Sequence, residues 1–558
     1  MQKFTTSICA VLTFAALLQS TKSIAAPIKT FTEYCQQKST LPEATKHTVE
    51  VLLKKAGTQN CQQANQKLTS LTELDISHSK VSDLQPLAKL TNLTELNLWS
   101  NQVTDIKPLV TLTNLSNLNL GYNKISNLKP LSSLTNLTKL GLWYNEISDV
   151  TPLADLTNLT DLGLAFNKIT GFQPLAKLTN LTSLVLRGNQ ISDIAPLANL
   201  TNLTHLELWK NKVSDLTPLA NLTKLTELDL VGNQIRDLKP LANLTNLSDL
   251  QLGANKISNL QGLENLTNLT KLTLNYNEIS TLEPLSKLIN LTDLQIGGNQ
   301  ISNLQALENL TDLTHLQLGG NKIASLQPLA NFTNLTHLHL LNNQISNLQG
   351  LENLTSLDYL ELGMNKISNL QPLTNLTNLK HLWMRNNRIS SLQGLENLTN
   401  LANLNLAENQ IIDVKPLANL TNLKALALSF NKISDIKPLA NLNNLVQLFL
   451  ENNQINDIKP VSGLTELFAI ALTSNKISDI QPLSNLDKLF SIIADDNQIS
   501  DIKPISNLTN LLNLSLSGNK ISDIKPLSNL NNLSAINLQE NPIKNKTCPI
   551  QKDDVCKF

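Results

Sequence analysis

Histidines are the residues of this chain best suited to metal or proton chemistry. His315, His337 and His339 fall on neighbouring copies of a repeated segment, so their imidazoles could converge on a cation such as zinc. Two other readings stay open: pH-dependent binding, because imidazole titrates near neutral pH, and ordinary exposure of histidine on a strand. Since no carboxylate stands directly beside the trio, it is a weak metal candidate, and we predict no metal site and no cofactor.

Enzyme chemistry finds little support in the sequence. No nucleophile, base and oxyanion donor recur together, and there is neither a glycine-rich phosphate loop nor a metal-ligand motif. The many Asn-Leu-Thr triplets match the N-glycosylation acceptor pattern, but they belong to a recurring Leu-Thr-Asn-Leu-Thr stretch that the repeat itself explains. We therefore predict a protein that is not an enzyme.

Aromatic side chains gather where each repeated segment ends its predicted strand, outside the predicted core. Tryptophan, tyrosine and arginine are enriched at interface hot spots, and exposed aromatic area often marks a recognition surface. The alternative is that rings merely tolerate an exposed sheet, where neighbours stack. The predicted ligand-binding residues are Trp99, Tyr122, Trp143, Tyr144, Phe166, Arg187, Trp209 and Lys210 in the N-terminal third, and Tyr359, Trp383 and Arg385 in a second group.

The distribution of charged residues limits the classes of partner that the protein could bind. The 44 basic and 44 acidic residues cancel over the chain, but the predicted concave face is mostly acidic. Nucleic acid and anionic lipid are disfavoured by this sign, because both need a basic footprint. A protein partner with a basic patch fits better, although solvated acidic residues without a role remain an alternative.

A 22-residue repeat positions all these side chains. Asparagine stands at every twenty-second position from Asn101 to Asn541, with Ser79 in the same register, which makes 22 coils. Such a unit cannot bury its own apolar residues and must stack on its neighbours. Leu96 and Leu98 alternate with polar residues, so the strands should stack into one parallel sheet, with the asparagine amides bonded to buried backbone groups.

The segment after each asparagine should not form a strand. Its proline cannot donate to a sheet, so we expect short 3₁₀ turns on the convex side. Four coils replace this proline at intervals of 44 residues, by Gly262, Ala306, Gly350 and Gly394.

The repeat, with Asn-x-Ile-Ser-Asp-Ile-x-Pro-Leu-x-x-Leu-Thr-Asn-Leu, resembles that of the internalin-type leucine-rich-repeat proteins of bacteria, over residues 67 to 541. The resemblance implies an α/β leucine-rich-repeat solenoid, a right-handed arc whose concave parallel sheet binds a protein. No immunoglobulin-like module or wall-sorting motif follows Asn541, so a host-invasion role is not implied. The paired cysteines look more like those of secreted Gram-negative or cyanobacterial repeat proteins.

The two ends of the chain indicate export. Lys3, an apolar run and Ser23-Ile24-Ala25 have the layout of a secretory signal, and no later segment is apolar for long enough to span a bilayer. Four cysteines flank the repeats, and in an exported chain they predict two disulfides, one in each cap, more readily than a metal site. They are Cys35 with Cys61 and Cys548 with Cys556.

These observations predict four segments: a signal peptide at 1–25, a helical N-terminal cap at 26–66, the solenoid at 67–541 and a C-terminal cap at 542–558. A helix in the first cap should open at Pro42-Glu43 and close at Gly57. We predict a secreted, periplasmic or cell-surface recognition module for a protein. The alternative is a carbohydrate-binding or structural surface protein, since exposed rings can also stack on sugars.

Overall fold

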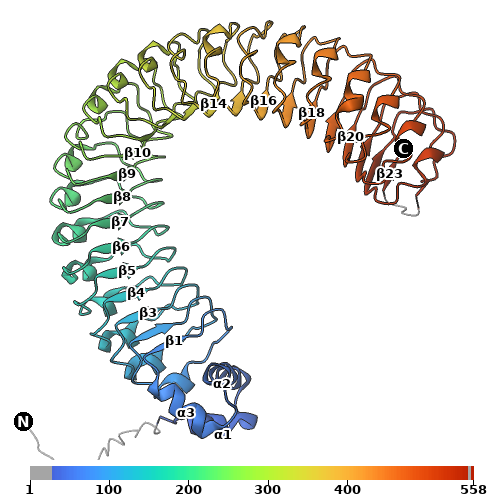
Figure 1. Cartoon of the computed structure of the whole chain (residues 1–558). Coiled ribbons are helices and arrows are strands. Elements are labelled where there is room, and N and C mark those ends of the chain that lie inside the picture. Colours follow the sequence, from blue (N-terminus) through green and yellow to red (C-terminus); the bar gives the residue numbers. More distant parts are fainter. Residues whose placement is uncertain (1–27, 551–554) are drawn as a thin grey trace, which may run out of the picture.

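The computed structural model describes residues 28–550 and 555–558. The predicted signal peptide at 1–25 lies outside the described residues. Three helices, α1 (Phe31–Gln36), α2 (Glu43–Ala56) and α3 (Cys61–Ser70), precede a long arc of stacked coils (Figure 1). The strands line the inner side of the arc and the short turns follow its outer side, so the predicted solenoid is confirmed.

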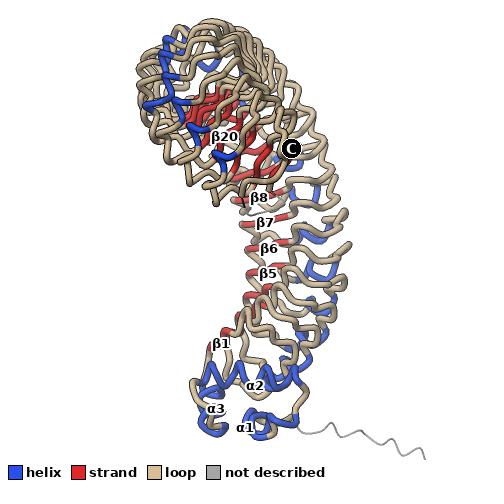
Figure 2. Tube along the Cα trace, turned by 90° about the vertical axis from the view of Figure 1, so that its right-hand side faces the viewer, coloured by secondary structure: helices blue, strands red, loops and turns tan. Residues whose placement is uncertain are grey.

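One parallel sheet runs through the described coils, and Figure 2 shows its short strands in red along successive coils. Each strand pairs with the next at an offset of one repeat, as in Glu73↔Glu95, and the last pair joins Ile536 to Cys556. The strands are β1 Glu73–Asp75, β2 Glu95–Asn97, β3 Asn117–Asn119, β4 Lys139–Gly141, β5 Asp161–Gly163, β6 Ser183–Val185, β7 His205–Glu207, β8 Glu227–Asp229, β9 Asp249–Gln251, β10 Lys271–Thr273, β11 Asp293–Gln295, β12 His315–Gln317, β13 His337–His339, β14 Tyr359–Glu361, β15 His381–Trp383, β16 Asn403–Asn405, β17 Ala425–Ala427, β18 Gln447–Phe449, β19 Ala469–Ala471, β20 Ser491–Ile493, β21 Asn513–Ser515, β22 Ala535–Asn537 and β23 Cys556–Lys557.

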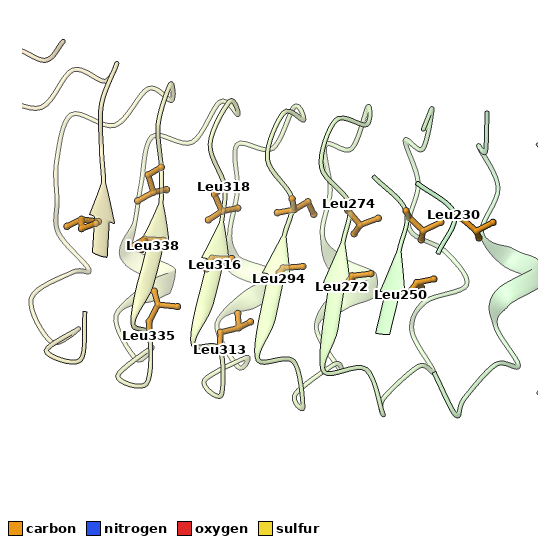
Figure 3. Close-up of a cluster of buried hydrophobic side chains, with 14 of the residues drawn as sticks. Leu230, Leu250, Leu272, Leu274, Leu294, Leu313, Leu316, Leu318, Leu335 and Leu338 are labelled. Carbon is orange, nitrogen blue, oxygen red and sulfur yellow. The ribbon is translucent and has the colours of Figure 1, made fainter. Parts of the chain in front are cut away.

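The core consists of leucine and isoleucine stripes that run along the whole arc. Leu272, Leu294, Leu316 and Leu338 occupy the same position in successive strands and are almost fully buried (Figure 3). These side chains belong to one continuous cluster of buried residues that runs through the coils, so no coil has a core of its own. The solenoid is therefore stable only as a stack.

The recurrent asparagine joins each coil to the one before it. The amide of Asn101 donates to the carbonyl oxygens of Leu98 and Ile76, and its Oδ1 accepts from the backbone N–H of Val81 at 2.8 Å. Ile76 and Val81 belong to the preceding coil, and the same three bonds recur as far as Asn541. This confirms the predicted column of amides that satisfy buried backbone groups.

Convex 3₁₀ turns are confirmed as well. Lys437–Leu439 is typical, with proline in its first turn and its leucine buried. Gly262, Gly350 and Gly394 instead have φ between 100° and 106°, and a Cβ atom on any of them would lie within 2.5 Å of a carbonyl oxygen in the preceding coil. These positions therefore require glycine, whereas the coil with Ala306 retains a 3₁₀ turn at Gln305–Leu307.

The N-terminal cap closes the first coil. As predicted, α2 starts after Pro42 and ends at Gly57, whose φ of 65° is left-handed. Thr48 donates to the carbonyl of Asp83 at 2.7 Å, and His47 bonds the carbonyl of Ser79. The last cap helix, α3, continues to Ser70, past the boundary predicted at 66.

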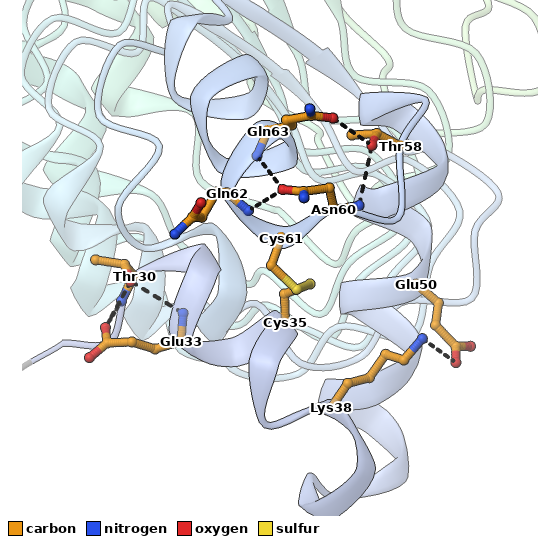
Figure 4. Close-up of a disulfide and its surroundings, with 10 residues drawn as sticks. All are labelled: Thr30, Glu33, Cys35, Lys38, Glu50, Thr58, Asn60, Cys61, Gln62 and Gln63. Carbon is orange, nitrogen blue, oxygen red and sulfur yellow. Dashed lines mark hydrogen bonds and ion pairs between the residues drawn. A yellow bond between two sulfur atoms is a disulfide. The ribbon is translucent and has the colours of Figure 1, made fainter.

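Both predicted disulfides are present. Cys35–Cys61 joins α1 to α3, where the side chain of Asn60 caps the start of α3 (Figure 4). Cys548–Cys556 fixes the segment that adds β23 to the open end of the sheet. Across the described ranges, no helix is long and apolar enough to cross a membrane.

The asparagine column gives a direct stability prediction. Replacing Asn321 by alanine leaves the carbonyls of Leu318 and Ile296 and the N–H of Ile301 without their partners. Because each buried unsatisfied group costs about 1–3 kcal/mol, we expect Asn321→Ala to lower the free energy of unfolding by about 3 kcal/mol in urea. Asn309→Ala, at an exposed convex site, is the control, and an equal loss in both variants would contradict this account.

Candidate recognition surface

Two residues directly precede each recurrent asparagine, and we call them the strand-end row. The second of them is left-handed in every coil, with φ between 52° and 70°. Five coils place glycine there, which adopts this conformation freely. Five others place an aromatic ring there, namely Tyr122, Tyr144, Phe166, Tyr276 and Phe430.

Rings of the N-terminal third form a continuous ladder along this row. Tyr122 stacks on Tyr144 at 4.2 Å between ring centroids, and Tyr144 stacks on Phe166 at 4.3 Å. Trp99 meets Tyr122 edge to face, Trp209 meets Phe166 in the same way, and His78 extends the ladder beyond Trp99. The structure thus brings together most of the first predicted group.

The ladder is not explained by stability. A left-handed non-glycine residue costs about 1–2 kcal/mol, whereas an aromatic pair contributes about 0.5–1.5 kcal/mol beyond its buried area. Tyr122 and Tyr144 also remain 44% and 39% exposed. Three strained positions cost about 3–6 kcal/mol and two stacked pairs return about 1–3 kcal/mol, so stacking alone does not repay the strain.

The Trp143 indole is not part of the ladder and packs on the backbone of glycine residues. A Cβ atom on Gly163 would be 1.9 Å from its Nε1, one on Gly141 would be 3.1 Å from its Cη2, and one on Gly121 would be 2.9 Å from its Cε3. Atoms from both indole rings therefore rest on glycines of three adjacent coils. No ring contact found in the described residues involves Trp143, so its outer face is free of other rings.

A hollow of ≈ 240 Å³ opens beside this indole on the concave sheet. Its floor is the glycine backbone of β4 and β5, because Gly141 and Gly163 replace larger strand residues. Lys139, Asp161 and Val185 line its sides. The hollow combines a flat aromatic wall, an apolar floor and two opposite charges, which suits one anchoring side chain of a ligand.

A charged network borders the ladder at β6–β8. His205 bonds Glu207 at 3.0 Å and Glu227 at 2.9 Å, and Arg187 pairs with Glu207 at 3.2 Å. The hydrogen bond to Glu207 is the main cause that raises the pKa of His205, and the bond from His205 in turn lowers the pKa of Glu207. Burial raises the pKa of nearby Asp229.

Arg187 and Lys210 therefore differ in what they do. The Arg187 guanidinium lies 5.8 Å from the centre of the Phe166 ring as well as beside Glu207, so it joins the ladder to the network. Lys210 occupies the left-handed position of its coil and is exposed. Only Arg187 is held in place by the residues around it.

The second predicted group is less regular than expected. Trp383 does not belong to the strand-end row like the other tryptophans. It lies four residues before Asn387, as the last residue of β15, and its Nε1 is buried without a hydrogen-bond partner. Tyr359 begins β14 and contacts the ring of His339 at 4.7 Å. Arg385 is paired with Glu408.

The histidine trio does not assemble a metal site. His315 and His337 stack at 4.5 Å, and their Nδ1 atoms bond Thr314 and Thr336, while that of His339 bonds Glu361. Among residues 28–550 and 555–558, no three His, Cys, Asp or Glu side chains are placed to hold a metal ion. Burial and the neighbouring histidines lower the pKa of His337.

Acidic side chains gather at the start of the arc. A hollow of ≈ 320 Å³ over β1–β3 is lined by Glu73, Asp75 and Glu95 together with asparagines. None of the ion pairs found in the described residues uses these three carboxylates. This end of the concave face carries uncompensated negative charge.

Comparison with known proteins fits this architecture. The family described as "Leucine Rich repeats (2 copies)" matches in sixteen segments between residues 69 and 466. The chain belongs to the leucine-rich-repeat family. Among curated proteins, none matches it.

Several solved structures are similar. An internalin (inlF) from Listeria monocytogenes is 36% identical, with a TM-score of 0.51, over 60% of this chain and 94% of its own. The leucine-rich-repeat ectodomain of the Arabidopsis receptor kinase HAESA is 24% identical, with a TM-score of 0.63, over 85% and 87%. The plant peptide hormone receptor RGFR1 is 23% identical, with a TM-score of 0.62, over 81% and 86%. The two plant proteins share the fold alone.

The sequence analysis did not identify the three glycines on which the Trp143 indole packs. Gly121, Gly141 and Gly163 are strand or strand-end residues, and glycine in a strand often marks a close approach by another group. That signal was available in the sequence. Its meaning depended on where the Trp143 indole came to lie.

The charged network predicts a pH dependence. Since its pKa is raised, His205 contributes stability that is fully present below its unfolded pKa of about 6.5 and is lost as pH rises through the folded value. We expect His205→Gln to lower the free energy of unfolding more at pH 5.5 than at pH 8.5, with a difference under about 1 kcal/mol because partly exposed pairs are screened. An equal loss for His205→Gln at both pH values would contradict the assignment.

Proposed function

We propose that this protein is a secreted, non-enzymatic recognition module that binds a protein partner through the aromatic, acidic concave face of its solenoid. The Trp143 indole carries this proposal. It presents one free face beside a hollow and is immobilised from below by three glycines, so a ligand could bury it with little loss of side-chain freedom. Rigid, partly exposed tryptophans of this kind are typical interface hot spots.

The ladder supports a macromolecular ligand. Its rings extend from Trp99 to Trp209 across six coils, so their exposed edges form a strip rather than a single pocket. Their left-handed backbone costs free energy that stacking alone does not repay. Residues kept in strained conformations without a gain in stability point to function.

Charge supports a partner with a basic patch. Glu73, Asp75 and Glu95 lie at the N-terminal end of the same surface, and none of them takes part in an ion pair found in the described residues. A complementary basic patch would increase the association rate and exclude acidic competitors.

Export is supported by the two disulfides, since such bonds persist mainly in oxidising compartments. We place the protein outside the cytoplasm, secreted, periplasmic or at the cell surface. The internalin-type resemblance is consistent with this location, and no particular partner is transferred from it.

A carbohydrate ligand is the second candidate, and one observation favours it. The free face of Trp143 lies beside Asn117 and Asp161, whose oxygens could accept hydrogen bonds from sugar hydroxyls. The ladder argues the other way, because its ring faces are covered by one another and cannot stack on a sugar.

The test is capture of a partner by the immobilised mature protein from the exported and envelope fractions of the source cells. We expect a protein retained by the parent and reduced at least about tenfold by Trp143→Ala, the loss expected for a hot spot. Gly163→Ala should have the same effect without removing any side chain, because its Cβ displaces the indole.

Phe430→Gly is the control, since Phe430 is an exposed ring of the strand-end row that lies outside the ladder and away from Trp143. Equal capture by all four proteins would contradict the proposal. Retention of the parent only on purified envelope polysaccharide would favour the carbohydrate alternative.

A further inference from the structure

A second hollow, distant from Trp143, lies along the strand-end row in the middle of the arc. Its volume is ≈ 280 Å³ and its floor consists of two consecutive Gly-Gly pairs, Gly297-Gly298 and Gly319-Gly320. We call it the glycine trough. It lies beyond the C-terminal ends of β10–β14, where other coils carry side chains.

Tyr276 forms one wall of the trough. At 74% exposure it is the most exposed large apolar side chain in the described ranges, and its φ of 58° is left-handed. Unlike the ladder rings, it has no ring partner among the contacts found there. Gly298 makes room for it, because a Cβ atom at that position would lie 2.7 Å from Cδ1 of Tyr276. Neither stacking nor burial compensates the strain at Tyr276.

The opposite end combines apolar surface with one negative charge. Leu341 lines the trough and is 38% exposed, and Met364 in the next coil is 50% exposed. Glu361 is the only carboxylate in the lining, and His339 bonds one of its oxygens at 3.0 Å. No lysine or arginine lines the trough, so Glu361 has no permanent cation beside it there.

The trough is held in shape by an amide network. The side chain of Asn275 accepts from the N–H of Gly297 and donates to the side-chain oxygens of Gln295 and Gln317, at 3.4 and 3.1 Å. These bonds fix the side of the trough nearest the sheet. A ligand would therefore meet a preformed surface.

The length of the trough indicates which kind of ligand it could hold. Tyr276 and Glu361 belong to coils four apart, and at about 4.8 Å per coil the trough spans roughly 19 Å. An extended chain advances about 3.3 Å per residue, so roughly six residues would cover this distance. A floor of glycine lets another main chain approach closely, which a row of side chains would prevent.

We propose that the glycine trough binds an extended segment of a protein partner, with an apolar side chain packed against Tyr276 and an arginine or lysine paired with Glu361. The proposal rests on the proposed function only in taking the ligand to be a protein. It adds a site that is separate from Trp143 and names the chemistry of the segment that fills it.

A phage-displayed library of random linear heptapeptides, panned on the parent protein, tests this directly because it needs no knowledge of the partner. We expect enrichment of peptides that carry a basic residue and an apolar residue. Their affinity should fall at least about tenfold in Glu361→Gln, the change expected when a paired charge is lost.

Two further variants remove the trough while using residues that the repeat already tolerates. Tyr276→Gly installs the residue found at this position in five other coils, and Gly320→Asn fills the floor with the residue found at Asn342, Asn386 and Asn452. Both should fold and lose the selected peptides, whereas Phe430→Gly should retain them.

Enrichment of acidic peptides, or selected peptides that bind all variants equally, would overturn the proposal, as would the absence of any enrichment over Gly320→Asn. Since Trp143→Ala should bind the selected peptides normally, failure here is distinguishable from failure of partner capture at the Trp143 hollow.

Discussion

The bonds of one asparagine amide determine the rest of this structure. Each coil ends its strand with carbonyls and an N–H group directed into the interior, and without the amide these groups would be buried unpaired. Asn101 satisfies two carbonyls and one N–H at once, and two of the three belong to the preceding coil. One residue in 22 thus fixes both the turn inside a coil and the attachment of that coil to its neighbour.

This constraint also creates the surface that we associate with function. After Leu98, simple alternation would direct Asn101 outward, and the left-handed residue at position 100 reverses it so that the amide points into the coil. Every coil therefore exposes one left-handed residue at its strand end. Glycine is the least strained choice there, so the coils that use tyrosine or phenylalanine depart from what folding alone favours.

The fold was predictable because it is periodic and local. Leu96 and Leu98, the recurrent asparagine, the convex prolines and the flanking cysteines each indicate their structural role through spacing alone. The ladder was predictable in part, since Tyr122, Tyr144 and Phe166 share one repeat position. The position of the Trp143 indole was not predictable, because it depends on glycine at one position in each of three coils. The prediction assigned Trp383 to the strand-end row because an outward position within the strand resembles the strand end in sequence. The partners of His339 could not be predicted, because they depend on side-chain rotamers.

The central claim is that the ladder rings are present for binding and not for stability. Its most direct test is the free energy of unfolding in urea of a variant that carries Tyr122→Gly, Tyr144→Gly and Phe166→Gly together. The account predicts a value within about 1 kcal/mol of the parent, or above it, because relief of left-handed strain offsets the lost stacking. A fall of several kcal/mol would show that the ladder holds the solenoid together and would contradict the account.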